Sequence, residues 1–263
     1  MNAIHKALQV SAFILCLLNP LFGQNSAGIR DSLRKNKQRC LIFSGFAGLA
    51  QPARDLAADY GSFGQAGGCI EYVSKSGFMA GTEAAYLFGG TVKKDPIPNL
   101  RNPDNTITGT NGSDAVFKVF QRGSIGPVLR LGYCHRAKKP FFKNNHDGGF
   151  TLNASLGWLR HFTYIQDISK KTPQFSDQYR IGYDRLATGL LTGLWVGYLF
   201  IPEHRGLNLH FELGYGAGFT RTARYSFSDG LPAGTKRNDN LFQARLKVCF
   251  TVRSRSENTV YFY

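Results

Sequence analysis

The sequence has few acidic residues, and its overall hydropathy is low. Its 263 residues include 17 Asp and Glu against 32 Lys and Arg, which gives a formal net charge of +15. The mean hydropathy of −0.22 excludes a polytopic helical membrane protein, because each of its spans would need about 20 apolar residues. Hydrophobic residues make up 43% of the chain and charged residues 19%, which excludes wholesale disorder.

Cysteine is also scarce. Cys16 lies in an apolar N-terminal run, which leaves Cys40, Cys69, Cys134 and Cys249. None of them forms a Cys-X-X-Cys pair or lies at metal-ligand spacing from a His, so we expect no zinc site and no cofactor. Some could form disulfides in an oxidising compartment, with a connectivity that spacing does not define. The alternative is that all four are small side chains at strand positions.

Glycine and aromatic residues, in contrast, are abundant. The chain contains 30 Gly, 21 Phe and 12 Tyr, and the aromatic content favours β-structure. A transmembrane β-barrel is compatible with the low hydropathy, because only every second residue of a barrel strand needs to be apolar.

The N-terminus is typical of an export signal. Lys6 precedes the apolar run 7–18, and Gly23 is an acceptable last residue before a cleavage site. We predict a signal peptide over residues 1–23; the alternative is a buried N-terminal helix. A basic periplasmic segment (24–39), a barrel (40–252) and a C-terminal tail (253–263) would follow.

Two segments alternate between apolar and polar residues without interruption. In residues 207–220, Phe211 and its odd-numbered neighbours are apolar, whereas His210 and Glu212 lie on the opposite face. Residues 241–252 repeat this pattern. A period of two predicts β-strands, because no helix could separate these sets of residues.

Six more segments show a softer form of the same pattern. In one of them, residues 123–134, the alternation places Ile125 on the apolar face with Leu129 and Leu131. Eight strands result, each near or above the roughly 9–11 residues that a tilted strand needs to cross a bilayer. The six segments are 40–50, 64–74, 77–90, 123–134, 150–162 and 183–200.

The links between these strands alternate in length. Long links and shorter links in alternation are typical of outer-membrane barrels. The sequence therefore predicts an all-β fold: an eight-stranded antiparallel up-and-down transmembrane β-barrel with long extracellular loops and short periplasmic turns. The alternative is a soluble eight-stranded calycin with its apolar face inward. The long links are 51–63, 91–122, 163–182 and 221–240; the shorter ones are 75–77, 135–149 and 202–206.

The polar faces of the strands are rich in Gly and carry charged residues of both signs. In a narrow barrel, Gly would make room for large polar side chains. We therefore predict a buried polar network that fixes strand register and fills the lumen, which argues against a general diffusion pore. Its predicted members are Glu71, Glu83, Arg130, Arg185, His210, Glu212, Arg245 and Lys247.

The basic excess gathers near the predicted periplasmic side. A basic rim of this kind would contact outer-membrane lipid headgroups or an acidic protein partner; the alternative is a solvated rim that orients the barrel. Nucleic acid is not an expected partner of an exported protein. The rim consists of Arg34, Lys35, Lys37, Arg39, Arg136, Lys138 and Lys139.

Candidate catalytic residues are sparse. His161 with Ser155 or Ser169 and Asp167 would supply a base, a nucleophile and a carboxylate, but no spacing demands this arrangement. We therefore expect no catalytic residues and a protein that is not an enzyme.

Asp184 and Arg185 lie where the link 163–182 ends. Their side chains could form an ion pair that pins this link over the barrel mouth. The alternative is an ordinary ion pair at a strand start, worth under about 1 kcal/mol if exposed.

The chain resembles the small outer-membrane β-barrel proteins of Bacteroidetes, the PorT-like group. The residues that carry the resemblance are the signal peptide, Gly182-Tyr183-Asp184-Arg185-Leu186, Gly197-Tyr198-Leu199 and the aromatic end Tyr261-Phe262-Tyr263. The resemblance implies an outer-membrane protein without enzymatic activity, acting as an accessory or scaffold subunit in outer-membrane protein assembly or type IX secretion. The alternatives are a lipid-modifying enzyme centred on His161, and a surface barrel for adhesion or ligand binding.

Overall fold

The computed structural model describes the strands and part of the links between them. The predicted signal peptide, the segment 24–39 and residues 254–263 lie outside the described residues. The described residues are 40–96, 101–104, 106–108, 112–136, 146–167, 183–202, 208–223 and 232–253.

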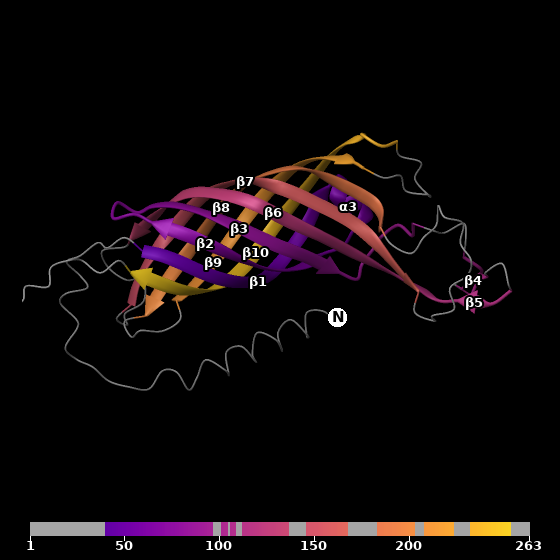
Figure 1. Ribbon diagram of the computed structural model, residues 1–263, viewed down its shortest axis with the longest axis horizontal. Helices are drawn as coiled ribbons and strands as arrows, with labels where there is room; N and C mark the ends of the chain where they lie inside the picture. Colours follow the sequence, from indigo (N-terminus) through magenta and orange to yellow (C-terminus); the bar gives the residue numbers. More distant parts are fainter. Residues whose placement is uncertain are drawn as a thin grey trace, which may run out of the picture.

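Eight long antiparallel strands form one closed barrel (Figure 1). Their order around the barrel is β1-β10-β9-β8-β7-β6-β3-β2, so every strand pairs with its neighbours along the chain and β1 pairs with β10. The predicted eight-stranded up-and-down barrel is confirmed. The strands are β1 (Cys40–Arg54), β2 (Phe63–Val73), β3 (Phe78–Gly89), β6 (Phe117–Arg136), β7 (His146–Asp167), β8 (Tyr183–Pro202), β9 (Asn208–Thr222) and β10 (Lys236–Arg253).

Three short elements lie in the described parts of the links. The helix α3 (Asp55–Asp59) follows β1, and the strands β4 (Ile107–Thr108) and β5 (Asp114–Ala115) pair with each other between β3 and β6. In Figure 1, α3 and the β4–β5 pair lie toward the same end of the barrel. Across the described ranges, no helix combines the length and the apolar character needed to cross a membrane.

The two ends of the barrel differ. We call the end where β1 begins and β10 finishes the terminal end, and the opposite end, where α3 and the β4–β5 pair lie, the loop end. Several strands continue further toward the loop end than the alternation predicted: β1 reaches Arg54, β6 starts at Phe117 and β10 starts at Lys236. The expected long link 51–63 is therefore reduced to a helix and a few flanking residues.

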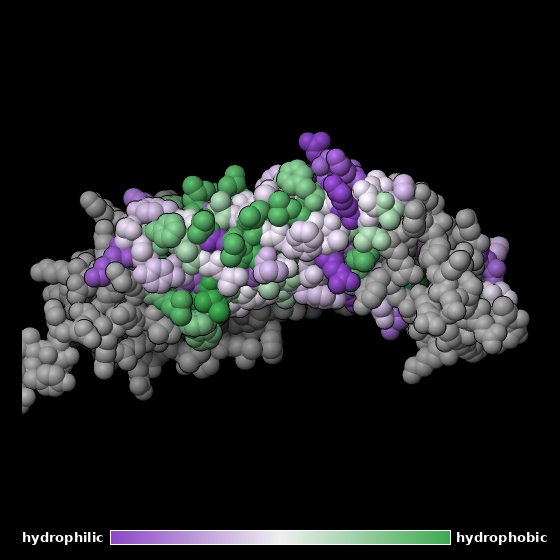
Figure 2. All heavy atoms as spheres, turned by 45° about the horizontal axis from the view of Figure 1, so that its top comes forward, coloured by the Kyte–Doolittle hydropathy of each residue, from purple (hydrophilic) through white to green (hydrophobic). Residues whose placement is uncertain are grey.

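The two faces of the barrel wall have opposite character. Large apolar side chains point outward; Leu194, Leu129 and Phe250 are among the most exposed, at 66%, 64% and 61%. Figure 2 shows apolar residues spread over the barrel wall. Charged side chains such as Glu212 and Lys247 point inward and are fully buried.

Ile125 is an exception to the predicted faces. The alternation placed it on the outward apolar face, but it is buried inside the barrel. The pairing of β6 with β7 shifts register between Ile125 and Val128, and the pairing with β3 shifts between Glu83 and Ala85. Beyond a β-bulge, the residues that face inward and outward along the strand are exchanged. The outward position of Leu129 therefore does not predict the direction of Ile125, which lies on the other side of the bulge.

Inward-facing glycines make room for large side chains. A Cβ atom added at Gly214 would lie 2.2 Å from Cε3 of Trp195, and one added at Gly218 would lie 2.2 Å from the Asp239 carbonyl oxygen. Glycine at these positions lets an indole ring and a neighbouring strand occupy the space of a side chain, as predicted for a narrow lumen.

Replacing Gly214 by Ala is therefore expected to lower the free energy of unfolding by about 1–3 kcal/mol, because the added methyl group overlaps the Trp195 ring. Gly45→Ala is the matched control, because a Cβ atom there would have no atom within 4 Å. Denaturant titration of the folded barrel, followed by its shift in gel mobility, measures both variants. Equal midpoints for the two variants would contradict the close fit around Trp195.

Candidate functional site: the barrel interior

The barrel interior is built in layers. An apolar layer lies near the terminal end and another toward the loop end, and the charged residues lie between them along β2, β3, β6, β9 and β10. The first layer contains Ile42, Val73, Met79, Cys134, Leu199 and Cys249. The second includes Phe46, Leu56, Tyr60, Phe63, Leu87, Val128, Leu159 and Leu241.

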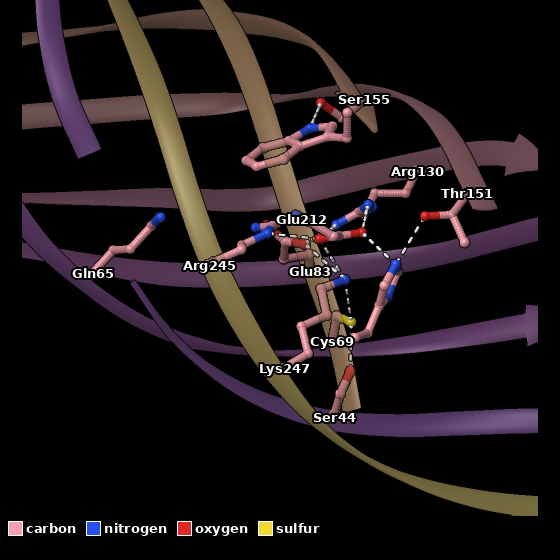
Figure 3. Close-up of polar contacts among 12 residues, drawn as sticks. Ser44, Gln65, Cys69, Glu83, Arg130, Thr151, Ser155, Glu212, Arg245 and Lys247 are labelled. Carbon is pink, nitrogen blue, oxygen red and sulfur yellow. Dashed lines mark hydrogen bonds and ion pairs between the residues drawn. The ribbon is translucent and has the colours of Figure 1, made fainter. Parts of the chain in front are cut away.

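Glu212 is the centre of the charged layer. The Arg130 Nη2 donates to its Oε1 at 2.6 Å, the Arg245 Nε donates to its Oε2 at 2.7 Å, and the Lys247 Nζ lies 3.1 Å from the same Oε2. All four side chains are at most 1% exposed. One carboxylate therefore holds cations from β6 and β10 together inside the barrel (Figure 3).

Two further carboxylates balance the charge. The Arg130 Nη1 donates to Glu83 Oε2 at 2.7 Å, and Arg245 donates to the other Glu83 oxygen. Glu71 Oε2 lies 3.4 Å from the Lys247 Nζ, and Glu71 Oε1 lies 3.4 Å from the Arg130 Nε. Together with Glu212, the cluster contains three carboxylates and three basic side chains. This balance meets the requirement that buried charges be paired.

Aromatic side chains enclose the guanidinium groups. The Arg245 guanidinium lies 3.7 Å from the Trp195 ring centroid and 4.8 Å from that of Phe46. The Trp195 indole N–H donates to the Ser155 hydroxyl at 3.0 Å, so its polar atom is also satisfied. Such stacking is a favourable environment for Arg in a dry interior.

Seven of the eight predicted network residues come together in this layer. His210 joins it at the edge: its Nε2 hydrogen-bonds with the Thr151 hydroxyl at 2.8 Å and lies 3.6 Å from Glu212 Oε1. The structure differs for Arg185, which is buried at the loop end and donates to the Lys94 carbonyl at 2.7 Å. Like the network residues, Arg185 is at an inward-facing position of its strand. It lies near the start of β8, however, and β8 starts at the loop end, so its side chain is far from the charged layer along the barrel.

Several residues that contact the charged layer were not predicted from the sequence. Trp195 has the same odd-numbered parity along β8 as Arg185, which would have indicated an inward position. Thr151 and Ser155 lie on the polar face of β7, where hydroxyl groups carry too little sequence signal to reveal a partner.

A second polar group lies at the loop end. The His161 Nε2 lies 2.7 Å from Asp239 Oδ2, and the Arg237 Nη2 bridges Asp239 Oδ1 at 3.1 Å and Asp59 Oδ2 at 2.7 Å. The Thr220 hydroxyl donates to Asp239 as well. These contacts tie α3, which ends at Asp59, to β10 and β7.

Tyr60 closes the interior beneath this group. Its side chain is fully buried, its hydroxyl lies 3.0 Å from the Thr163 hydroxyl, and its ring packs edge-on against His161. Burial raises the pKa of the Tyr60 phenol above its usual value, so the group stays neutral and serves as a hydrogen-bond partner. The segment after β1 therefore covers the loop end of the barrel.

The catalytic alternative does not assemble around His161. Its carboxylate partner is Asp239, whereas the Asp167 side chain and Ser169 lie outside the described residues. Ser155 lies on the same strand as His161, about 20 Å away by residue count, and its hydroxyl accepts the bond from Trp195. Among the side chains that the structure describes, no three His, Cys, Asp or Glu residues are grouped to hold a metal ion.

The remaining predicted residues are only partly placed. Arg136 ends β6 at the terminal end, with its side chain outside the described residues, as are the other six residues of the predicted basic rim. The Asp184 side chain is not described either, so its predicted ion pair with Arg185 stays a prediction. The four cysteines are not disulfide-bonded, and the Cys69 thiol lies 2.9 Å from the Ser44 hydroxyl.

In comparisons with known proteins, no protein-family model and no curated protein matches the chain. Among solved structures, it is similar to Neisserial surface protein A at 12% identity, over 79% of this chain and 96% of the other, with a TM-score of 0.42. It is also similar to Ail, the attachment invasion locus protein of Yersinia pestis, at 11% identity, over 81% and 99% of the two chains, with a TM-score of 0.38. For the outer membrane protein OprG from Pseudomonas aeruginosa the identity is 11%, over 81% and 96%, with a TM-score of 0.28. These values describe a likeness of fold alone, and membership of the PorT-like group stays a prediction.

Proposed function

We propose that this protein is an integral outer-membrane β-barrel with a closed lumen, which acts as an accessory or scaffold subunit of envelope machinery, in outer-membrane protein assembly or type IX secretion. The observation that carries the proposal is the inversion of the barrel: its outer wall is apolar and its interior is charged and filled.

The membrane location rests on the outer wall. A soluble calycin would turn its apolar face inward and its charged face to water. Here Leu129, Leu152, Leu194 and Val196 are each more than half exposed, while the charged layer is buried. An apolar wall of this extent is unfavourable in water and suits the hydrocarbon layer of a bilayer.

The absence of transport rests on the filled lumen. The charged layer, the two apolar layers and the loop-end group around Asp239 occupy successive levels of the described interior. An eight-stranded barrel has room only for its own side chains, and we infer that no continuous water-filled path crosses it.

Conductance measurements test this part of the proposal. We expect the purified barrel to insert into vesicles and to give no single-channel conductance in a planar bilayer, because the buried salt bridges block the lumen. Stable ion conductance by the folded barrel would contradict the closed lumen, and failure to insert would contradict the membrane location.

The scaffold role is supported by surfaces built at the loop end. The described part of the link between β3 and β6 is structured: Ile107, Ala115, Phe117 and Ile165 pack together, and the Asn102 amide donates to the Thr108 hydroxyl at 2.8 Å. A folded element beyond the barrel wall offers a defined docking surface, whereas catalysis would need an accessible group and His161 is 1% exposed.

Photo-cross-linking distinguishes a scaffold from an adhesin. A cross-linking residue at Asp104, exposed at the loop end, and one at Lys75, exposed in the turn after β2, sample the two ends of the barrel. The scaffold role predicts cross-links to other envelope proteins of the same cell. A barrel purified alone in mild detergent, without cross-links from either position, would contradict it; cross-links to external ligands from Asp104 alone would favour adhesion.

A further inference from the structure

A row of basic residues crosses four neighbouring strands on the outer wall. Arg160 on β7 is the register partner of Thr188 on β8, Thr188 is the partner of Arg221 on β9, and Arg221 is the partner of Lys236 on β10. The three basic side chains are exposed. We call Arg160, Arg221 and Lys236, with Arg122 of β6, the basic row.

Arg122 extends the row to β6, so that four strands carry a basic residue of the row. It pairs with Phe162, two residues from Arg160, so the two arginines are diagonal neighbours. The Arg122 guanidinium lies 5.2 Å from the Phe120 ring centroid, and that of Arg160 lies 5.7 Å from the Phe162 centroid. Stacking of this kind orients a guanidinium and still leaves N–H donors along its edge.

An apolar row lies directly beneath the basic row, on the side of the terminal end. Trp158 is the register partner of Leu190, and Leu190 is the partner of Phe219. Their side chains are 48%, 40% and 57% exposed. The Trp158 indole N–H donates to the Thr188 hydroxyl at 2.5 Å, which joins the two rows. The basic row thus borders the apolar row on its loop-end side.

Uncharged or basic side chains occupy the described strand positions around the row, and the exposed Asp55 carboxylate lies near its β10 end, where the Asn238 backbone N–H donates to it at 2.7 Å. On β6, β7, β9 and β10 the neighbouring outward positions include Lys118, Gln166 and Asn238. In Figure 2 a strongly hydrophilic column crosses the barrel wall between apolar surface and the loop end. Cations in a row at a lipid boundary create a positive potential that attracts anionic headgroups.

We propose that the basic row binds the phosphate groups of a phosphorylated glycolipid of the lipid A type in the outer leaflet, with its acyl chains lying on Trp158, Leu190 and Phe219. This inference rests on the proposed outer-membrane location. A lipid with two phosphates matches it, because Arg160 and Arg221 are separated by one strand, which is about 10 Å. A zwitterionic phospholipid has no net charge for the row to neutralise, and a soluble polyanion would make no use of the apolar row.

The test is lipid binding by the purified, folded barrel in a neutral detergent, followed by native mass spectrometry. The probes are diphosphorylated lipid A, its monophosphorylated derivative and phosphatidylglycerol. We expect tightest binding of the diphosphorylated form. The triple variant Arg160→Gln, Arg221→Gln, Lys236→Gln should lose at least about tenfold in affinity for it, because charge-assisted contacts to phosphate are removed.

The control variant Lys75→Gln, Lys93→Gln, Lys94→Gln removes the same charge away from the row and should bind lipid A as the unaltered protein does. Equal losses in the two variants, or phosphatidylglycerol binding as tightly as lipid A, would overturn the proposal. So would inorganic polyphosphate that competes fully with the lipid. Gel mobility verifies that each variant is folded, and Arg160→Lys with Arg221→Lys should retain most of the affinity.

The two proposals fail in different ways. A barrel that inserts into vesicles but shows no preference for lipid A contradicts the glycolipid site and leaves the membrane location intact. A barrel that does not insert contradicts both.

Discussion

Replacing Glu212 by Ala is expected to lower the free energy of unfolding by about 3–5 kcal/mol. The carboxylate is within 3.1 Å of cationic nitrogens from Arg130, Arg245 and Lys247. Its removal leaves three buried cations with two carboxylates, and an uncompensated buried charge is far more costly than the intact pair is stabilising. Urea titration of the barrel in detergent or vesicles, read from gel mobility, measures the change.

Two further variants make this prediction specific. Asp104→Ala removes an exposed carboxylate from the loop end and should change stability by less than about 1 kcal/mol. Combining Glu212→Gln with Lys247→Met restores equal numbers of charges, so it should recover part of the loss. If Glu212→Ala unfolds at the same urea concentration as the unaltered protein, the charged layer does not hold the barrel together.

Replacing Leu194 by Arg should lower the free energy of unfolding in a bilayer by about 2–4 kcal/mol. Leu194 points outward from β8, halfway by residue number between Thr188 in the basic row and Phe200 near the terminal end, and its side chain is 66% exposed. At the middle of the hydrocarbon layer, Arg must lose its hydration or distort the lipid.

Gln166→Arg is the matched control for depth. Gln166 is exposed on the outward face of β7 at the loop end, where an added Arg should cost about 0–1 kcal/mol. A soluble calycin would tolerate Arg equally at both positions, because both are on its surface. Equal stabilities of Leu194→Arg and Gln166→Arg in vesicles would therefore contradict the membrane location.

The sequence was sufficient to predict the barrel wherever the two faces of a strand meet different surroundings. Along β9, Phe211 faces outward and Glu212 faces the lumen, so the period of two is complete. The pattern weakens where β10 starts, at Lys236, because both faces there are polar. The hydrogen bonds between the strands continue past this point, but the two faces of the strands no longer differ in polarity. The strands were therefore predicted too short.

The alternation of residues along a strand predicted which side chains point into the lumen, but not how far along the barrel each one lies. It predicted that Glu71, Glu83 and Arg245 point into the lumen, and it placed Arg185 with them although Arg185 lies at the loop end. The pair of His161 and Asp239 joins residues from β7 and β10. No local pattern relates these two strands, so only the closed barrel reveals this contact.

The charged layer also has a consequence for how the barrel is made. Its acids come from β2, β3 and β9, and its bases come from β6 and β10. Glu71 and Glu83 meet Arg245 and Lys247 only after β1 has joined β10, because the chain places them at opposite ends of the sheet. An open sheet would expose unpaired charges to lipid along its edges, at high cost. We therefore expect membrane insertion and closure to be one cooperative event, in which the bases of β10 neutralise the acids of β2 and β3.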